Sequence, residues 1–309
     1  MPTDPLAGEV EKEIQRLVSV ILGKRPQLEG LVKPFSALFI EIARLTDGLK
    51  HGLDGVPLEA AGKRISEGVP ILSGISLSFI RPALDHAFTA LVPVVKTWFP
   101  AIVPALDRLE SRQRHGGLDL SLLAEDYLGG GLKRLEEMAP ASEADRQSLS
   151  FMVQLALSAV LQAVAPRLAA QAGEIYWSRG YCPICGSLPL ISYLSKPQTA
   201  PSEFLVGGGG QRYLHCAVCG HDWHVRRHLC AACETDDSDQ HLYFNVADAV
   251  GERVDICPHC AHYLPCIDLR ETDAFPHLET VAVGLAHLDM LAQEKGFHPM
   301  VRTPWNTFE

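Results

Sequence analysis

Apolar and polar residues alternate with the period of an α-helix over the first 170 residues. In the segment EVEKEIQRLVSVILG, a single helical face carries Ile14, Leu17, Val18, Ile21 and Leu22, which is the i, i+3, i+4 and i+7 spacing of an amphipathic helix. The pattern repeats in LVKPFSALFIEIARLTDGL. Between breaks that carry glycine or proline, it predicts further helices over residues 79–99, 100–114, 120–137 and 143–170. We therefore expect an all-helical N-terminal domain over residues 1–173.

After about residue 174, helical periodicity gives way to short β-type runs. These runs have strand length and are bounded by glycines or cysteine pairs; they are SLPLISYLS, RYLHC, HDWHVRRH, HLYFNV, ERVDIC and HYLPCIDLR. Helical spacing returns from about Pro276 to Lys295, and Gly296 is placed to end that helix. The sequence thus predicts an α+β fold. We expect the helical domain, two small β modules over residues 174–226 and 227–272, and a C-terminal helix and tail over residues 273–309.

Composition is that of an ordinary globular protein, with 47% hydrophobic and 21% charged residues in a chain of 309. The formal net charge is −10, of which residues 171–309 contribute −8. This acidity argues against a nucleic-acid-binding protein, because such domains carry a basic face. The uncharged run over residues 148–166, SLSFMVQLALSAVLQAVAP, approaches membrane-spanning length. Its two Gln and three Ser favour a helix buried in a soluble bundle, so we expect no membrane insertion.

All nine cysteines lie between Cys182 and Cys266. A secreted disulfide framework does not normally use identical tight spacings, and the N-terminus lacks the apolar core of a signal peptide. We therefore expect a cytoplasmic protein, because in a reducing compartment such pairs bind metal or act as redox dithiols. Eight of the nine form four Cys-x-x-Cys pairs, namely Cys182/Cys185, Cys216/Cys219, Cys230/Cys233 and Cys257/Cys260.

A Cys-x-x-Cys turn directs two thiolates to one side, and two such turns complete a tetrahedral four-sulfur site. The four turns therefore predict two metal ions, with redox dithiols and inert buried thiols as the alternatives. Pairing the first turn with the second, and the third with the fourth, leaves a hairpin-length stretch inside each site. Cross-brace pairing of the first turn with the third is the alternative. Four thiolates suit zinc or iron, and the turns CPICG and CAVCG resemble those of rubredoxin, which holds iron.

The remaining candidate residues carry weaker signals. Cys266 has no partner pair, and we expect a buried thiol, with a redox or regulatory role as the alternative. Four histidines surround the second pair, and we interpret them as strand-borne neighbours of the site, with a ligand role as the alternative. No phosphate loop, dinucleotide motif, nucleophile elbow or His-Glu-x-x-His motif occurs. We therefore assign no catalytic residue and do not expect an enzyme. The four histidines are His215, His221, His224 and His228.

In the order of its motifs, the C-terminal half resembles one family. YCPICGSLP, RYLHCAVCGHDWHVRRHLCAAC, ICPHCAHYLPCIDL and LDMLAQEKGF, over roughly residues 175–300, are similar to the formate dehydrogenase accessory protein FdhE. The resemblance implies a cytoplasmic protein that assists maturation of a respiratory formate dehydrogenase and contacts its catalytic subunit. It also implies two bound metal ions, with iron favoured over zinc. One ion is assigned to Cys182, Cys185, Cys216 and Cys219, and the other to Cys230, Cys233, Cys257 and Cys260.

Two other functions fit parts of the sequence. An iron-based electron-transfer or redox protein would use the same sites, whereas a nucleic-acid-binding zinc-ribbon protein is opposed by the acidity of this half. For protein recognition, Trp223, Arg226 and Arg227 are residue types that anchor interfaces. For Trp223, packing against its own metal site is the alternative. We also expect metal to hold the C-terminal half together, while the helical domain folds independently.

Overall fold

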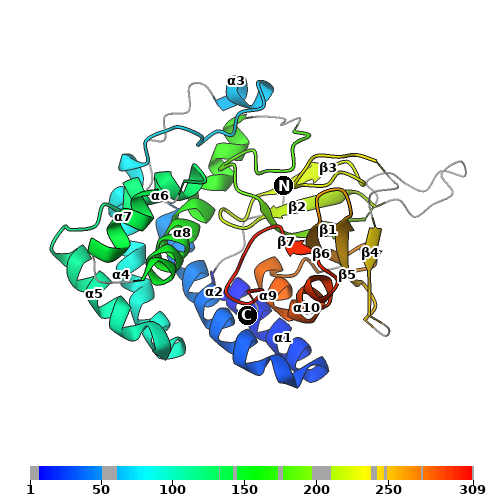
Figure 1. The fold of residues 1–309 in the computed structure, drawn as a ribbon, viewed down its shortest axis with the longest axis horizontal. Coiled ribbons are helices and arrows are strands. Elements are labelled where there is room, and N and C mark those ends of the chain that lie inside the picture. The colour runs from blue at the N-terminus through cyan, green and yellow to red at the C-terminus, as the bar shows by residue number, and fades with distance from the viewer. Residues whose placement is uncertain are drawn as a thin grey trace, which may run out of the picture.

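The structure is a computed structural model with a helical half and a sheet half (Figure 1). It describes residues 7–50, 61–131, 133–141, 145–172, 177–196, 210–237, 242–246, 249–272 and 274–307. The N-terminal helices are α1 (Ala7–Lys24), α2 (Glu29–Leu49), α3 (Ala61–Ser66), α4 (Arg81–Trp98), α5 (Val103–Arg114), α6 (Leu120–Leu128), α7 (Lys133–Ala141) and α8 (Arg146–Ala172).

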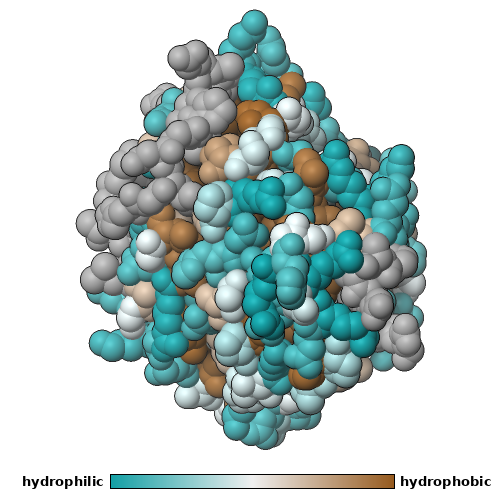
Figure 2. All heavy atoms as spheres, turned by 90° about the vertical axis from the view of Figure 1, so that its left-hand side faces the viewer, coloured by the Kyte–Doolittle hydropathy of each residue, from teal (hydrophilic) through white to brown (hydrophobic). Residues whose placement is uncertain are grey.

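Helix α8 is the centre of the helical half. It packs against α2, α4, α6 and α7, and the run Leu155–Leu157 and the residues around it are buried on all sides of the helix. The helix is long and apolar enough to cross a membrane, but 78% of its most apolar 18-residue window is buried inside the protein. This burial is that of the core helix of a soluble protein. On the face formed by the helical half, hydrophilic side chains predominate and hydrophobic ones are scattered (Figure 2).

Among the described residues the sheet has seven strands, and six of them follow the order β3-β2-β1-β6-β5-β4, with β7 beside β6. β1, β2 and β3 form one antiparallel unit, as do β4, β5 and β6. The two units join through a parallel pairing of β1 with β6, in which Ser192 lies opposite Cys266. The strands are β1 (Pro189–Leu194), β2 (Arg212–Cys216), β3 (Asp222–Val225), β4 (Leu242–Phe244), β5 (Glu252–Cys257), β6 (His262–Asp268) and β7 (His298–Pro299).

Two short helices, α9 (Leu278–Gly284) and α10 (Ala286–Glu294), lie between the sheet and the hairpin of α1 and α2 (Figure 1). An ion pair of Arg25 with Glu252 ties the end of α1 to β5. One hydrophobic cluster extends from Ile14 on α1, through α8, to Trp223 on β3. The core therefore does not divide between the helical half and the β modules, although we expected the helical domain to fold independently.

The predicted α+β architecture is confirmed. Each module contains a hairpin, β1 with β2 or β4 with β5, and a third strand after its second cysteine turn, β3 or β6. Two predicted helices are each broken in two. Residues 120–137 form α6 and α7, because the run Gly129–Gly131 interrupts the helix and Gly130 takes a φ of +69°. The C-terminal helix breaks at Leu285 between α9 and α10. Residues 173, 174 and 273, where predicted domain boundaries fall, lie outside the described residues.

Candidate metal centres

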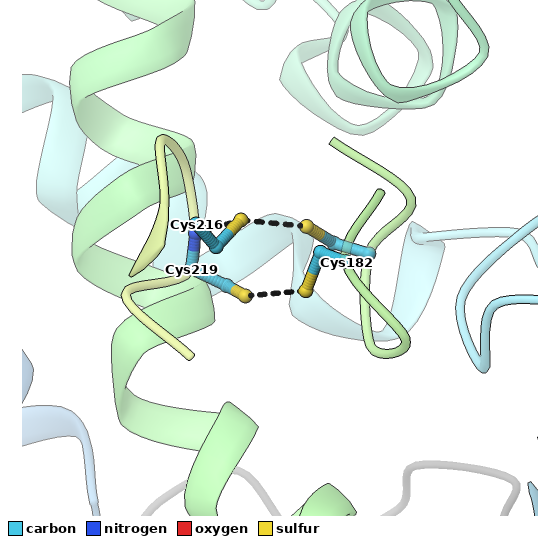
Figure 3. A group of neighbouring side chains, drawn as sticks. Cys182, Cys216 and Cys219 are labelled. Carbon is cyan, nitrogen blue, oxygen red and sulfur yellow. Dashed lines mark hydrogen bonds between the residues drawn. The ribbon is translucent and has the colours of Figure 1, made fainter. Parts of the chain in front are cut away.

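The first cysteine cluster joins the turn before β1 to the turn between β2 and β3. The Sγ atom of Cys182 lies 3.5 Å from that of Cys219, and the Sγ atom of Cys185 lies 3.4 Å from that of Cys216. The labelled sulfurs point toward one another beside a helix of the N-terminal half (Figure 3). The four sulfurs lie within 4.8 Å of each other, so the structure brings the first predicted turn to the second.

The second cluster joins the turn after β3 to the turn between β5 and β6. Here the Sγ atoms of Cys230 and Cys260 are 3.6 Å apart, and those of Cys233 and Cys257 are 3.8 Å apart. These four sulfurs also lie within 4.8 Å of each other. The third turn therefore meets the fourth, and the arrangement is the adjacent pairing rather than the cross-brace.

Both clusters fit a tetrahedral metal ion. Zinc–sulfur bonds of about 2.3 Å place neighbouring sulfurs about 3.8 Å apart in a tetrahedron, whereas a disulfide would need about 2.0 Å. The observed distances of 3.4–3.8 Å match the metal geometry. In the first cluster, the backbone N–H groups of Val218 and Cys219 also donate to Cys216 Sγ, each at 3.4 Å. The residues present would thus hold one four-thiolate ion per cluster.

All four cysteine turns share one backbone conformation. The residue after the second cysteine takes a left-handed conformation, and in three turns its N–H donates to the carbonyl of the first cysteine. Glycine fills this position in the first cluster, but a side chain fills it in the second, where the left-handed region costs about 1–2 kcal/mol. The four residues and their φ angles are Gly186 (+83°), Gly220 (+65°), Glu234 (+59°) and Ala261 (+57°).

Without metal, the thiols of each cluster influence one another's ionisation. Burial raises the pKa of Cys182 and Cys219 well above the ordinary value, whereas hydrogen bonds from the neighbouring thiols hold the pKa of Cys185 well below it. In the second cluster, burial raises the pKa of Cys260 to about 11. Burial also opposes ionisation of Cys233, but backbone and side-chain hydrogen bonds outweigh it and lower its pKa to about 7. Metal binding therefore has to displace protons from the remaining thiols.

Residues remote in sequence complete the surroundings of the first cluster. Ile71 and Leu72 donate their N–H groups to the carbonyls of Pro183 and Ile184, each at 2.9 Å. From α8, Ser158 Oγ donates to the carbonyl of Val218 at 2.9 Å. No pattern in the sequence predicts these contacts, because they depend on how the helical half docks onto the turns.

The histidines near the second turn lie outside both sulfur clusters. His215 is buried on β2, with Nδ1 2.7 Å from Asp222 Oδ1 and Nε2 3.3 Å from Glu279 Oε1. Although burial opposes protonation, these two carboxylates raise the pKa of His215 well above its ordinary value. His224 is exposed on β3 and stacks edge-on against Tyr213. His221 is half-buried and His228 is exposed.

The four remaining candidates differ in their exposure to solvent. Cys266 is fully buried on β6, where burial raises its pKa to about 11, as expected of a buried thiol. Trp223 is also buried, and its Nε1 donates to the carbonyl of Arg179 at 3.1 Å. It packs inside its own module and is unavailable to a partner. Arg226 is exposed and paired with Asp236, whereas Arg227 is half-buried.

Comparisons with known proteins agree with this picture. The sequence model of the FdhE central domain matches residues 181–227, which contain the first cysteine cluster. The FdhE homologue of Aquifex aeolicus is 27% identical over 257 residues, which cover 83% of this chain and 80% of that protein. The homologue of Edwardsiella ictaluri is 26% identical over 305 residues, or 95% and 89% of the two chains.

The fold has also been observed in a crystal. The crystal structure of the FdhE protein from Pseudomonas aeruginosa has a TM-score of 0.60 with this structure at 21% sequence identity. The match covers 95% of this chain and 92% of that one, so the helical half, the sheet and the C-terminal helices are all shared. Together with the matched central domain and the curated homologues, this shows that the chain is similar to the FdhE family in sequence and in fold.

Proposed function

We propose that this protein is an accessory protein that assists maturation of a formate dehydrogenase by contacting the immature catalytic subunit. The observation that carries the proposal is the similarity to the FdhE family, together with two four-cysteine clusters in the segment that carries the resemblance. The absence of a catalytic motif in the sequence favours protein recognition over catalysis.

The proposal includes two metal ions, one in each cluster. The sulfur distances of 3.4–3.8 Å support this part. Iron is favoured by the resemblance to rubredoxin and to FdhE, and zinc is the alternative, because four thiolates accept either ion. In either case the ion crosslinks two turns that are distant in the sequence and supplies folding free energy to the module.

The exposed part of the metal modules supplies the candidate partner surface. With Trp223 buried, the side chain best placed for recognition is that of Arg226, which is 65% exposed and whose nearest acidic partner is Asp236. Arginine forms directional pairs with carboxylates and stacks on aromatic rings, which makes it a frequent anchor of protein interfaces.

The test is a pull-down of the catalytic subunit, made in a strain unable to insert its cofactors, with purified metal-loaded protein. We expect Arg226→Ala, combined with Arg227→Ala, to weaken binding about tenfold, as is common for an anchoring arginine, without loss of metal. The matched control is Arg114→Ala, whose side chain is 63% exposed and pairs with Glu110 on the helical half. Equal binding by the double variant and the control would exclude this surface. Failure of the unaltered protein to capture the subunit would refute the proposed function.

A further inference from the structure

The two cysteine clusters differ in their access to solvent. In the first cluster, Cys182, Cys185, Cys216 and Cys219 are 0%, 2%, 1% and 2% exposed. In the second, Cys230 and Cys257 are 7% and 4% exposed, but Cys233 and Cys260 are only half-buried. Each turn of the second cluster therefore contains one cysteine that is partly exposed to solvent, whereas neither turn of the first does.

The first cluster is closed by the helical half. The turn at Ile71 and Leu72 is hydrogen-bonded to the first cysteine turn at Pro183 and Ile184, and Ser158 of α8 donates to the carbonyl of Val218 in the second cysteine turn. Tyr127 of α6 is half-buried near Cys216 and Cys185. An incoming ligand could reach these sulfurs only if the helices first separated from the turns.

The second cluster is fixed through the backbone of its third turn and is partly exposed to solvent at its fourth turn. Glu234, directly after the third turn, accepts a hydrogen bond from Gly180 N at 3.0 Å and pairs with Arg179 at 3.0 Å. The backbone of Ala231 approaches Gly180 so closely that a Cβ there would lie 2.1 Å from the Ala231 oxygen. These contacts fix the backbone of the third turn. In the fourth turn, Pro258 and His259 are exposed and the neighbouring Cys260 is half-buried.

Exchange of a thiolate-bound ion proceeds when an external ligand takes the place of a protein sulfur. An exposed sulfur permits this directly, whereas a buried one requires local unfolding, whose free-energy cost slows the reaction. We propose that the second cluster is the exchange site of this protein, giving up and accepting its ion through Cys233 and Cys260, while the first cluster keeps its ion as a structural crosslink. The ion passes as M²⁺ to an external ligand with sulfur or nitrogen donors, and the freed thiolates take up protons from solvent. This inference rests on the metal binding proposed above.

The test is metal release from the full chain, loaded anaerobically with two equivalents of zinc. In excess 4-(2-pyridylazo)resorcinol, we expect one equivalent to be released at least about tenfold faster than the other, the ratio that an opening cost of about 1.4 kcal/mol would give. Cys260→Ser should abolish the fast phase and retain the slow one. Release of both ions in a single phase, loading of fewer than two ions, or survival of the fast phase in Cys260→Ser would each overturn the inference.

A second measurement needs no variant. In zinc-loaded protein treated briefly with iodoacetamide and analysed by peptide mass spectrometry, we expect Cys233 and Cys260 to be alkylated before any cysteine of the first cluster. Cys266, which is fully buried and outside both clusters, is the internal control for a protected thiol. Alkylation of Cys182 or Cys219 at the same rate as Cys233 would contradict the assignment. Both readouts are independent of capture of the catalytic subunit, so they can fail while the proposed function stands.

Discussion

The unfolding free energy of Asp289→Asn, compared with that of wild type, should rise as the pH increases from acidic to neutral and alkaline values. Asp289 lies on α10 and is 1% exposed, and neither carboxylate oxygen has a hydrogen-bond partner in the described part of the chain. Burial raises the pKa of Asp289 to about 7, against a smaller opposing effect of the Tyr263 hydroxyl. The native protein therefore holds this carboxyl protonated at pH values where an unfolded chain would release the proton.

The magnitude follows from the difference in pKa. An unfolded Asp has a pKa of about 3.9, so the shift is about three units and is equivalent to about 4 kcal/mol. Between these two pKa values the unfolded state binds fewer protons than the native state, so the stability of the native protein falls as the pH rises and levels off above about pH 7. Asn cannot ionise, and the penalty disappears. The difference in unfolding free energy between Asp289→Asn and wild type should grow by about 3 kcal/mol between pH 5 and pH 8.

The assay is urea unfolding followed by circular dichroism, with both proteins zinc-loaded, at each pH unit over this range. Any pH dependence that comes from the cysteine clusters is common to both proteins and cancels in the difference. Burying the Asn amide has a free-energy cost that does not depend on pH. This cost would shift the difference in unfolding free energy by the same amount at every pH and leave its slope against pH unchanged. The control is Asp107→Asn, whose side chain is 58% exposed and should change stability by no more than about 1 kcal/mol. A difference between Asp289→Asn and wild type that stays flat from pH 5 to pH 8 would refute the reasoning.

Four further predictions concern the metal modules. Elemental analysis after anaerobic purification should find two ions per chain, and one or none would contradict the two-site assignment. Cys182→Ser should lose one ion, with on the order of 10 kcal/mol of binding free energy, and should become protease-sensitive in both halves. Cys266→Ser should keep both ions. Equal metal loss and protease sensitivity in the two variants would contradict the distinction between ligand cysteines and Cys266. Gly180→Ala should lower the thermal midpoint by several degrees, because its Cβ would lie 2.1 Å from the oxygen of Ala231. Ala261→Gly should stabilise the protein by about 1 kcal/mol, because it relieves the left-handed φ of +57° at this position. Unchanged midpoints in thermal unfolding would contradict these two expectations.

Local features of the fold could be predicted from the sequence. Helical periodicity located the N-terminal helices, and the four repeated spacings located the turns that gather in two clusters. The break between α6 and α7 also had a local signal in the run Gly129–Gly131, which outweighs the apolar periodicity of that segment. The burial of Trp223 had no such signal, because its partner at Arg179 is distant in the sequence.

The unequal exposure of the clusters could not be predicted either. All four turns look alike in sequence, and what separates them is the docking of residues 71–72 and of α8 onto the first cluster only. Such contacts depend on packing between segments about 60–110 residues apart, to which periodicity and spacing are insensitive. Only the glycines of CPICG and CAVCG distinguish the two pairs of turns locally, and these report the backbone conformation rather than access to solvent.

The parallel pairing of β1 with β6 has a consequence for biosynthesis. Ser192 and its partner Cys266 are separated by 74 residues, so β1 emerges from the ribosome with one edge unpaired. At about 5–20 residues per second, that edge waits several seconds for β6 to be synthesised. An unpaired apolar edge is a template for aggregation, and all six residues of β1 are buried in the finished sheet. The nascent chain therefore passes through an interval in which its first module is formed but vulnerable, and a chain that stopped before β6 would remain in that state.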